Sequence, residues 1–256
     1  MNPVIMGKIV YYILVSVTLL IIYNFKNIWI LIVLKILDYI NIPLKLTKSI
    51  NREIKKHLSN YFKLEKTEIV KNSIFILFPH GPTIFPAVLL PLLCDLEDEY
   101  SLIMVSKWIH LIPGSNMFTK LFANTITNEK GNLKLAIQQN TYPFIFYPGG
   151  IDECLHNNTY STPKKYQNIS VKMLNLLLNS KRNIHVVSIQ NEAECYYHYN
   201  FISKFYKWIN KYVEVGTPIP LPSRTGRKLE IKVSPPINTK KLTNIEQLKN
   251  LIYKNL

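Results

Sequence analysis

The sequence predicts an α/β fold in which a mostly parallel sheet is flanked by helices, preceded by an N-terminal membrane hairpin. Three observations lead to this prediction. Short β-branched or aromatic runs alternate with segments of helical spacing, these runs carry almost no charge, and apolar residues are concentrated in the first forty positions. Alternating strands and helices are typical of parallel sheets, whose strands are covered on both faces and are therefore apolar.

The N-terminal prediction depends on two apolar stretches. Residues 4–23 contain a single charge, and a helix of this length reaches about 30 Å, the thickness of a bilayer core. Residues 28–40 carry two charges, which favours a returning half-span or an interfacial helix. We therefore expect residues 1–42 to form a membrane anchor. A cleaved signal peptide is the alternative, but no small-residue cleavage site follows the first stretch.

The next segment is basic. Residues 45–72 hold eight basic and three acidic side chains, a net charge of +5. Basic charge beside a membrane segment is typical of its cytoplasmic side. We expect residues 43–72 to form a basic juxtamembrane helical segment, with a solvated helix face that contacts no lipid as the alternative.

The remaining residues, 73–256, are expected to form one α/β domain. Strands are predicted at 73–78, 102–106, 144–147, 184–189, 212–215 and 229–233. Helices are predicted at 82–96, 114–122, 132–139, 165–180, 200–210 and 245–254. The last helix follows Thr243 and Glu246, which have the spacing of a capping box.

Charge and cysteine content limit the classes of partner and chemistry. The chain has 256 residues, of which 18% are charged, yet its formal net charge is +15. Its partners are therefore expected to be anionic: nucleic acid, lipid head groups or a phosphorylated cofactor. The three cysteines are far apart and odd in number, so neither a disulfide framework nor a CxxC metal site is expected, and a reducing compartment fits best.

The first candidate site is the turn after the strand at 73–78, which reads Pro79-His80-Gly81-Pro82. Gly81 allows a backbone or a substrate to come close, and the proline after it can begin a helix. His80 is then expected beside a helix N-terminus, whose positive end keeps the imidazole neutral and able to accept a proton. His80 is thus a candidate general base, with a structural hydrogen-bonding histidine as the alternative.

The second candidate site is the turn after the strand at 144–147, where the chain reads Pro-Gly-Gly-Ile-Asp-Glu-Cys. The paired Gly149 and Gly150 can expose backbone N–H groups that hold an oxyanion or a phosphate. Asp152 and Glu153 follow, and their carboxylates could bind hydroxyls or orient His80. Ligands of open α/β folds collect at the carboxyl ends of the strands, which is where both turns are expected.

Together, the two turns resemble the diacylglycerol acyltransferase type 2 family, a branch of the glycerolipid and lysophospholipid acyltransferase superfamily. Residues 78–81, Phe-Pro-His-Gly, are similar to its HPHG motif, and residues 148–155 are similar to its GGxxE-x-L block, in the same order and at a similar separation. Weaker similarity extends the match to roughly residues 73–237. The N-terminal hairpin fits the membrane anchor of the family, and the resemblance implies a glycerolipid acyltransferase-like fold.

The resemblance also implies a reaction. His80 would take the proton from the hydroxyl of an acylglycerol, diacylglycerol in the first place, and that hydroxyl would attack the thioester of an acyl-CoA. It implies catalytic roles for His80 and Glu153 and substrate contacts for Pro79, Gly81, Gly149, Gly150 and Asp152. Acyl-CoA is the co-substrate, and no metal or other cofactor is implied. The expected location is the endoplasmic reticulum or an equivalent membrane, with the catalytic domain facing the cytoplasm.

The sequence departs from the family pattern in ways that bear on the mechanism. Phe78 replaces the first histidine of HPHG. The broader superfamily has an H-x4-D motif, whose aspartate orients the base, but the fifth residue after His80 is Phe85. This absence favours the diacylglycerol branch over the lysophospholipid branch. It leaves open which group orients His80, with Glu153 as the first candidate and Asp152 as the second.

Several alternatives stay open. A lysophospholipid or glycerol-phosphate acyltransferase is the first, and a non-catalytic, membrane-tethered lipid-binding module is the second. A hydrolase or thiol transferase would use Cys154 as nucleophile with His80 as base. A serine hydrolase lacks its G-x-S-x-G motif and a zinc enzyme lacks HExxH. Nucleic-acid binding would explain the basic charge but not the apolar N-terminus, so we expect no nucleic-acid partner.

Overall fold

The fold is described from a computed structural model. It describes residues 32, 35–36, 39, 48–78, 85–96, 101–106, 119–138, 141–149, 169–191, 196–197, 221–222 and 228–256. The helices within these ranges are α3 (Lys48–Leu58), α4 (Phe85–Leu93), α6 (Lys130–Gln138), α8 (Val171–Asn179), the short η2 (Thr239–Lys241) and α11 (Ile245–Lys254). The strands are β1 (Phe62–Lys66), β2 (Ile74–Phe78), β3 (Leu102–Val105), β4 (Asn124–Thr127), β5 (Phe144–Phe146), β6 (Asn183–Gln190), β7 (Tyr196–Tyr197), β8 (Leu221–Pro222), β9 (Leu229–Val233) and β10 (Ile237–Asn238).

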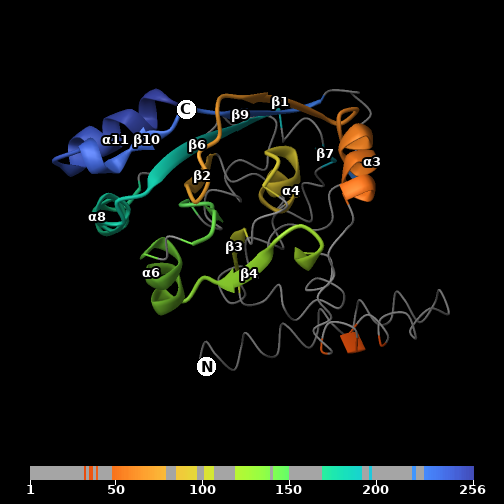
Figure 1. Ribbon diagram of the computed structural model, residues 1–256, viewed down its shortest axis with the longest axis horizontal. Helices are drawn as coiled ribbons and strands as arrows, with labels where there is room; N and C mark the ends of the chain where they lie inside the picture. The colour runs from red at the N-terminus through yellow and green to blue at the C-terminus, as the bar shows by residue number, and fades with distance from the viewer. Residues whose placement is uncertain are drawn as a thin grey trace.

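The main sheet is mostly parallel, as the sequence predicts. Its strand order is β1-β9-β6-β2-β5-β3-β4, and β10 pairs with β6 beside this path. The central strands β6, β2, β5 and β3 are mutually parallel, whereas β9 and β10 run antiparallel to β6. The described part of β7 and β8 forms a separate antiparallel pair. Strand β2 therefore lies near the middle of the sheet, with β6 on one side and β5 on the other (Figure 1).

Each face of the sheet is covered by its own set of helices. Alternate residues of β2, such as Phe75 and Leu77, pack with α4 and with Leu58 of α3 in one apolar core. The intervening residues, such as Ile76 and Phe78, pack with α6, α8 and α11 in a second core. Figure 1 shows α6, α8 and α11 grouped away from α4 and α3. Burial on both faces explains why β2 has no polar residue.

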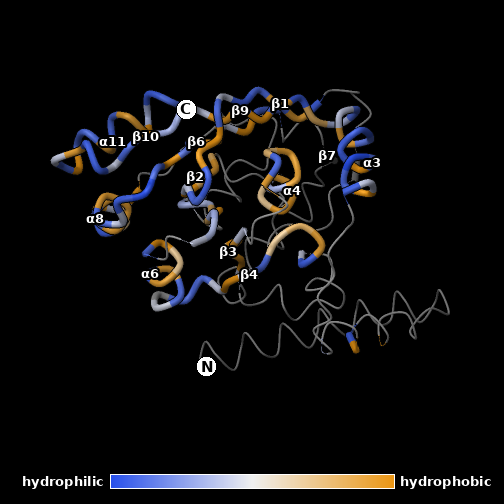
Figure 2. Tube along the Cα trace, viewed as in Figure 1, coloured by the Kyte–Doolittle hydropathy of each residue, from blue (hydrophilic) through white to orange (hydrophobic). Residues whose placement is uncertain are grey.

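Helices α4 and α3 differ in composition because they differ in burial. Every residue of α4 from Ala87 to Leu93 is buried, including Pro91, and Figure 2 shows this helix as hydrophobic along its length. A helix that is apolar all round belongs in a protein interior. Helix α3 is largely hydrophilic in the same view, and among its residues only Asn51 is fully buried.

The structure confirms the predicted strands that it describes. Strands β2, β3, β5, β6 and β9 each lie within one residue of the predicted bounds, and helices α6 and α11 also match closely. The predicted helix at 82–96 is described from Phe85 onward, and that at 114–122 is described only from Thr119. The predicted strand at 212–215 and helix at 200–210 lie outside the described residues.

Five of the described strands were not predicted: the two-residue β7, β8 and β10, and the longer β1 and β4, whose sequences are polar. Residues 43–72 were expected to be helical, and within the described part, 48–72, α3 is helical but Phe62–Lys66 forms β1, which pairs in parallel with β9 at one edge of the sheet. At the other end, β4 has the sequence Asn-Thr-Ile-Thr and pairs with β3. An end strand has one sheet neighbour and needs less apolar surface than a central one. The charges of β1 are used in ion pairs with β9, as between Lys232 and Glu65 at 3.2 Å.

Side-chain caps mark the start of two helices, and each differs from its prediction in one respect: α8 in its first residue, and α11, which begins at Ile245 as predicted, in its capping residue. Ser170 accepts a hydrogen bond from the Met173 N–H at 3.2 Å, so α8 begins at Val171 and the predicted helix over 169–170 is wrong. Before α11, Asn244 caps the Gln247 N–H at 2.9 Å. Gln247 in turn accepts from the Thr243 N–H at 3.1 Å, so the capping box is shifted by one residue from Thr243 and Glu246.

The predicted membrane hairpin is almost entirely outside the described residues. Only residues 32, 35–36 and 39 of the stretch 1–42 are described, and these are helical. Among the residues that the structure describes, no helix is long and apolar enough to cross a bilayer.

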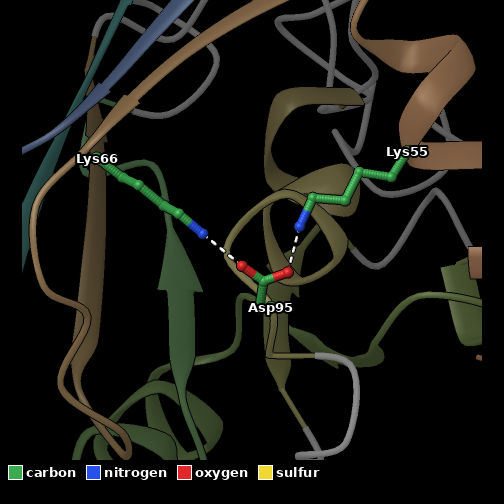
Figure 3. Close-up of polar contacts among 3 residues, drawn as sticks. All are labelled: Lys55, Lys66 and Asp95. Atoms are coloured by element: carbon green, nitrogen blue, oxygen red, sulfur yellow. Dashed lines mark hydrogen bonds and ion pairs between the residues drawn. The ribbon is translucent and has the colours of Figure 1, made fainter. Parts of the chain in front are cut away.

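One carboxylate joins α3 to the sheet. Asp95 follows α4 in a left-handed conformation, with φ of 59°, and forms ion pairs with Lys55 of α3 and Lys66 of β1 (Figure 3). Partial burial acts to raise the pKa of Asp95, but hydrogen bonds and charge from the two lysines hold it below its ordinary value. The contact therefore joins the end of α4 to α3 and β1, through lysines that precede Asp95 by 40 and 29 positions.

Replacing Asp95 by asparagine should change the free energy of unfolding only slightly. Asparagine tolerates the left-handed conformation, so the variant removes the charge and keeps the backbone. The carboxylate is 59% exposed and exposed ion pairs contribute little, so we expect a loss of less than about 1 kcal/mol that shrinks further in high salt. Urea unfolding at low and high salt measures this, and a loss several times larger would mean that α3 is held mainly through Asp95.

A buried arginine connects the segments that precede β2 and β5 with the end of α6. Arg182, just before β6, is 4% exposed, and its guanidinium donates only to backbone carbonyls among the described residues. The acceptors lie before β2 (Asn72 at 3.0 Å, Ser73 at 3.2 Å), at the end of α6 (Ala136 at 3.0 Å, Ile137 at 3.4 Å) and before β5 (Tyr142). Burial lowers the pKa of Arg182 to about 10, so it stays protonated at neutral pH. The side chain satisfies carbonyls that the last turn of α6 leaves open.

Candidate functional site

The two turns singled out by the sequence begin side by side at one edge of the sheet. Strand β2 pairs in parallel with β5, with Ile74 opposite Phe144 and Ile76 opposite Phe146. The chain therefore leaves both strands at their carboxyl ends in the same direction, at a spacing of about 5 Å between neighbouring strands. Such an edge is where ligands bind in open α/β sheets.

The described residues reach the border of the predicted site. Phe78 is the last described residue before His80 and is fully buried, while Gly149 lies in the turn after β5 and is half-buried. The other predicted site residues lie outside the described residues: Pro79, His80, Gly81, Gly150, Asp152 and Glu153. Their roles stay predictions, including the assignment of Glu153 or Asp152 as the group that orients His80.

Phe85, which occupies the position of the superfamily aspartate, is the first described residue of α4. This agrees with the expectation that a helix follows the turn at Pro79-His80-Gly81. The helix continues into the apolar core, where Ala87 and Val88 are 1% exposed. The start of α4 thus supplies no carboxylate at the fifth position after His80.

A polar residue that the sequence analysis did not select lies at the same edge. Ser188 of β6 is paired with Phe78, the last residue of β2, in the parallel pairing of the two strands. In the sequence, Phe78 precedes His80 by two positions. Its side chain is buried, and its hydroxyl has no hydrogen-bond partner among the described residues. Leaving a buried polar group unsatisfied costs about 1–3 kcal/mol. No motif marks this serine, because its position beside the end of β2 follows from strand pairing and not from sequence spacing.

His185 is a structural histidine in the core. It is fully buried on β6 and stacks on Phe75, with ring centroids 5.1 Å apart. Its Nε2 accepts a hydrogen bond from the Val70 N–H at 3.2 Å, so Nδ1 carries the proton and donates to the Ser234 carbonyl at 2.8 Å. Burial lowers the pKa of His185, against a smaller opposing effect of the Ser234 carbonyl. The ring is therefore neutral, and both its nitrogens are occupied by the backbone.

The free energy of unfolding should fall as the pH is lowered through the range below 6.5. The unfolded chain binds a proton at His185 near the ordinary pKa of 6.5, whereas the folded chain resists it because its pKa is lowered. The contribution of neutral His185 is thus complete above pH 6.5 and is lost as the pH falls toward the folded pKa, with a slope of at most about 1.4 kcal/mol per pH unit.

Urea unfolding of the full chain in detergent at several pH values measures this slope. A His185→Gln variant should lose the part of the slope that comes from this residue. A His57→Gln variant is the matched control, since His57 is exposed on α3. If the two variants keep the same acid slope as the wild type, His185 is not the group responsible.

Comparison with known proteins finds a distant similarity in structure and none in sequence. No protein family model matches the chain, and no curated protein sequence is similar to it. Among solved structures, the chain is similar to the crystal structure of the 1-acyl-sn-glycerophosphate (LPA) acyltransferase PlsC from Thermotoga maritima. The two share 13% sequence identity with a TM-score of 0.49, over 98% of this chain and 92% of the other. A similarity this distant carries no argument about activity.

The described cysteine is not a nucleophile. Cys94 follows α4, is 3% exposed, and burial raises the pKa of its thiol to about 12. A thiol with this pKa is protonated at neutral pH and therefore unreactive. Cys154, the residue of the alternative hydrolase mechanism, lies outside the described residues.

Proposed function

We propose that this chain is a membrane-associated O-acyltransferase that transfers a fatty acyl group from acyl-CoA to the hydroxyl of an acylglycerol, with diacylglycerol as the first choice of acceptor. The observation that carries the proposal is the parallel pairing of β2 with β5. This pairing starts the Phe-Pro-His-Gly turn and the Pro-Gly-Gly turn from neighbouring strand ends. The two segments of the sequence that resemble acyltransferase motifs thus begin at the carboxyl ends of neighbouring strands.

The proposed reaction is a direct transfer. His80 takes the proton from the acceptor hydroxyl as its oxygen attacks the thioester carbonyl, and Glu153 orients the imidazole. The N–H groups of Gly149 and Gly150 stabilise the oxyanion that forms. Collapse of this intermediate breaks the C–S bond, forms the ester and releases coenzyme A, whose thiolate receives the proton from His80. Pro79, Gly81 and Asp152 line the substrate site.

Three described residues support membrane attachment of the N-terminal stretch. Ile32, Ile36 and Tyr39 are helical and are 43%, 51% and 90% exposed. Their spacing of four and three residues puts them on one helix face, where apolar exposure is typical of lipid contact. We propose that residues 1–42 anchor the chain in the endoplasmic reticulum or an equivalent membrane, with the basic segment and the catalytic domain on the cytoplasmic side.

The acceptor can be identified with membranes from cells that express the full chain. These membranes would be incubated with labelled acyl-CoA and, in separate reactions, diacylglycerol, monoacylglycerol, lysophosphatidate or a long-chain alcohol. The proposal expects label in triacylglycerol above that of membranes lacking the chain. Label in phosphatidate alone would support a lysophospholipid acyltransferase, the activity named for the Thermotoga maritima structure. No product with any acceptor would contradict the acyltransferase function.

A further inference from the structure

Strand β6 brings a serine to the edge at which the proposed site lies. Ser188 is paired with Phe78, the last residue of β2, so the two side chains point to the same face of the sheet. The preceding residues of β6 on this face, Ile184 and Val186, belong to the apolar core formed with α8 and α11. Ser188 thus interrupts an apolar series just where β2 leaves the sheet.

The hydroxyl of Ser188 has no hydrogen-bond partner within the part of the chain that the structure describes, unlike the hydroxyls of three other buried serines. Ser73, Ser180 and Ser234 are also buried, and each donates a hydrogen bond to a backbone carbonyl, at 2.6 Å, 2.6 Å and 2.9 Å. Ser188 is 2% exposed, so bulk water does not replace the missing bond. An unsatisfied buried hydroxyl destabilises the fold and calls for an explanation.

A second such hydroxyl provides an internal comparison. Ser101 is fully buried, and no described residue forms a hydrogen bond with its Oγ. It directly precedes β3, whose first residue, Leu102, is aligned with Phe144 at the start of β5. Ser101 therefore lies at the amino end of the parallel strands, opposite to the edge that carries Ser188. The two serines share burial and chemistry and differ in their distance from the proposed site.

We propose that Ser188 is a substrate-positioning residue whose hydroxyl forms a hydrogen bond with an oxygen of the lipid acceptor. This inference rests on the proposed function. Ser188 lies on the β6 side of β2, whereas the glycine turn assigned to the acyl oxyanion follows β5 on the other side. The acyl group and the acceptor must approach His80 from different sides, which gives the β6 side to the acceptor. A ligand oxygen is then the partner that the described part of the protein does not provide.

The test compares Ser188→Ala with Ser101→Ala in the full chain. Removing either unsatisfied hydroxyl should leave the free energy of unfolding unchanged or raise it. Only Ser188→Ala should lower kcat/KM for diacylglycerol, by about 10- to 100-fold, because the acceptor oxygen loses its hydrogen bond. The KM for acyl-CoA should not change. Ser188→Thr keeps the hydroxyl and should recover most of the activity.

Several results would overturn the assignment. If Ser188→Ala keeps the wild-type kcat/KM, the hydroxyl contacts no substrate. If the variant changes only the KM for acyl-CoA, the hydroxyl contacts acyl-CoA and not the lipid acceptor. If the wild type transfers no acyl group, the proposed function fails by itself. Binding of a fluorescent diacylglycerol in mixed micelles then tests the contact separately. Weaker binding by Ser188→Ala but not by Ser101→Ala supports the contact between Ser188 and the acceptor. Equal binding by both variants, or no binding by the wild type, contradicts it.

Discussion

Replacing Arg182 by methionine should lower the free energy of unfolding by at least about 3 kcal/mol. Methionine fills much of the same volume but donates no hydrogen bond. The carbonyls before β2, before β5 and at the end of α6 would then lose the guanidinium that they share. Ala136 and Ile137 are buried, so their carbonyls would lose the guanidinium without compensation from water, whereas the Ser73 carbonyl keeps the Phe144 N–H at 3.0 Å.

Urea unfolding of the full chain in detergent would measure this loss. Arg52→Met is the matched control: Arg52 is exposed on α3, and its replacement should change stability by less than about 0.5 kcal/mol. If Arg182→Met does not fold, Arg182→Lys gives an intermediate measurement, since an ammonium has three donors and cannot span all five carbonyls. Equal stability of the Arg182 and Arg52 variants would contradict the role assigned to the guanidinium.

Replacing His80 by alanine should lower acyl transfer by about 10²- to 10⁴-fold, the range typical of general-base catalysis. The acceptor hydroxyl would have to attack while still holding its proton. The variant should fold normally, because the adjacent core, including Phe78 and Ile76, is unchanged. Initial rates at saturating acyl-CoA measure the effect.

The control for His80→Ala is Cys154→Ala. If the chain used a cysteine nucleophile, this second variant would lose activity, whereas direct transfer to the acceptor predicts that it retains it. A Glu153→Gln variant distinguishes a further point: if Glu153 orients His80, activity should fall and its pH profile should shift. Unchanged activity in Glu153→Gln would leave the orienting role to Asp152.

How far the sequence predicted the fold depended on how each strand is buried. Strands β2, β5 and β6 are covered on both faces, so their apolar runs identified them within a residue. Strands β1 and β4 were missed because they lie at the ends of the sheet and carry charged or polar residues. The polarity that suits an end strand is the same polarity that indicates a loop or a solvated helix.

The sequence can select candidate site residues where they form a local motif of residues adjacent in the sequence. It cannot select residues that are brought together only by the pairing of distant strands. The Pro-His-Gly and Pro-Gly-Gly turns are local features, and the structure starts them from adjacent strands as expected for an α/β sheet. Ser188 and Arg182 could not be selected in this way. Arg182 lies 110 positions from Asn72, and Ser188 is a similar distance from Phe78, so their roles follow only from the order of strands.

The most direct test of the proposed function is the transfer of a labelled acyl group from oleoyl-CoA to diacylglycerol by membranes containing equal amounts of the wild type or His80→Ala. We predict that the wild type forms labelled triacylglycerol with stoichiometric release of coenzyme A and that the variant does so at least about 100 times more slowly. Equal rates in the two samples, or label recovered only as free fatty acid, would contradict an acyltransferase with His80 as its base.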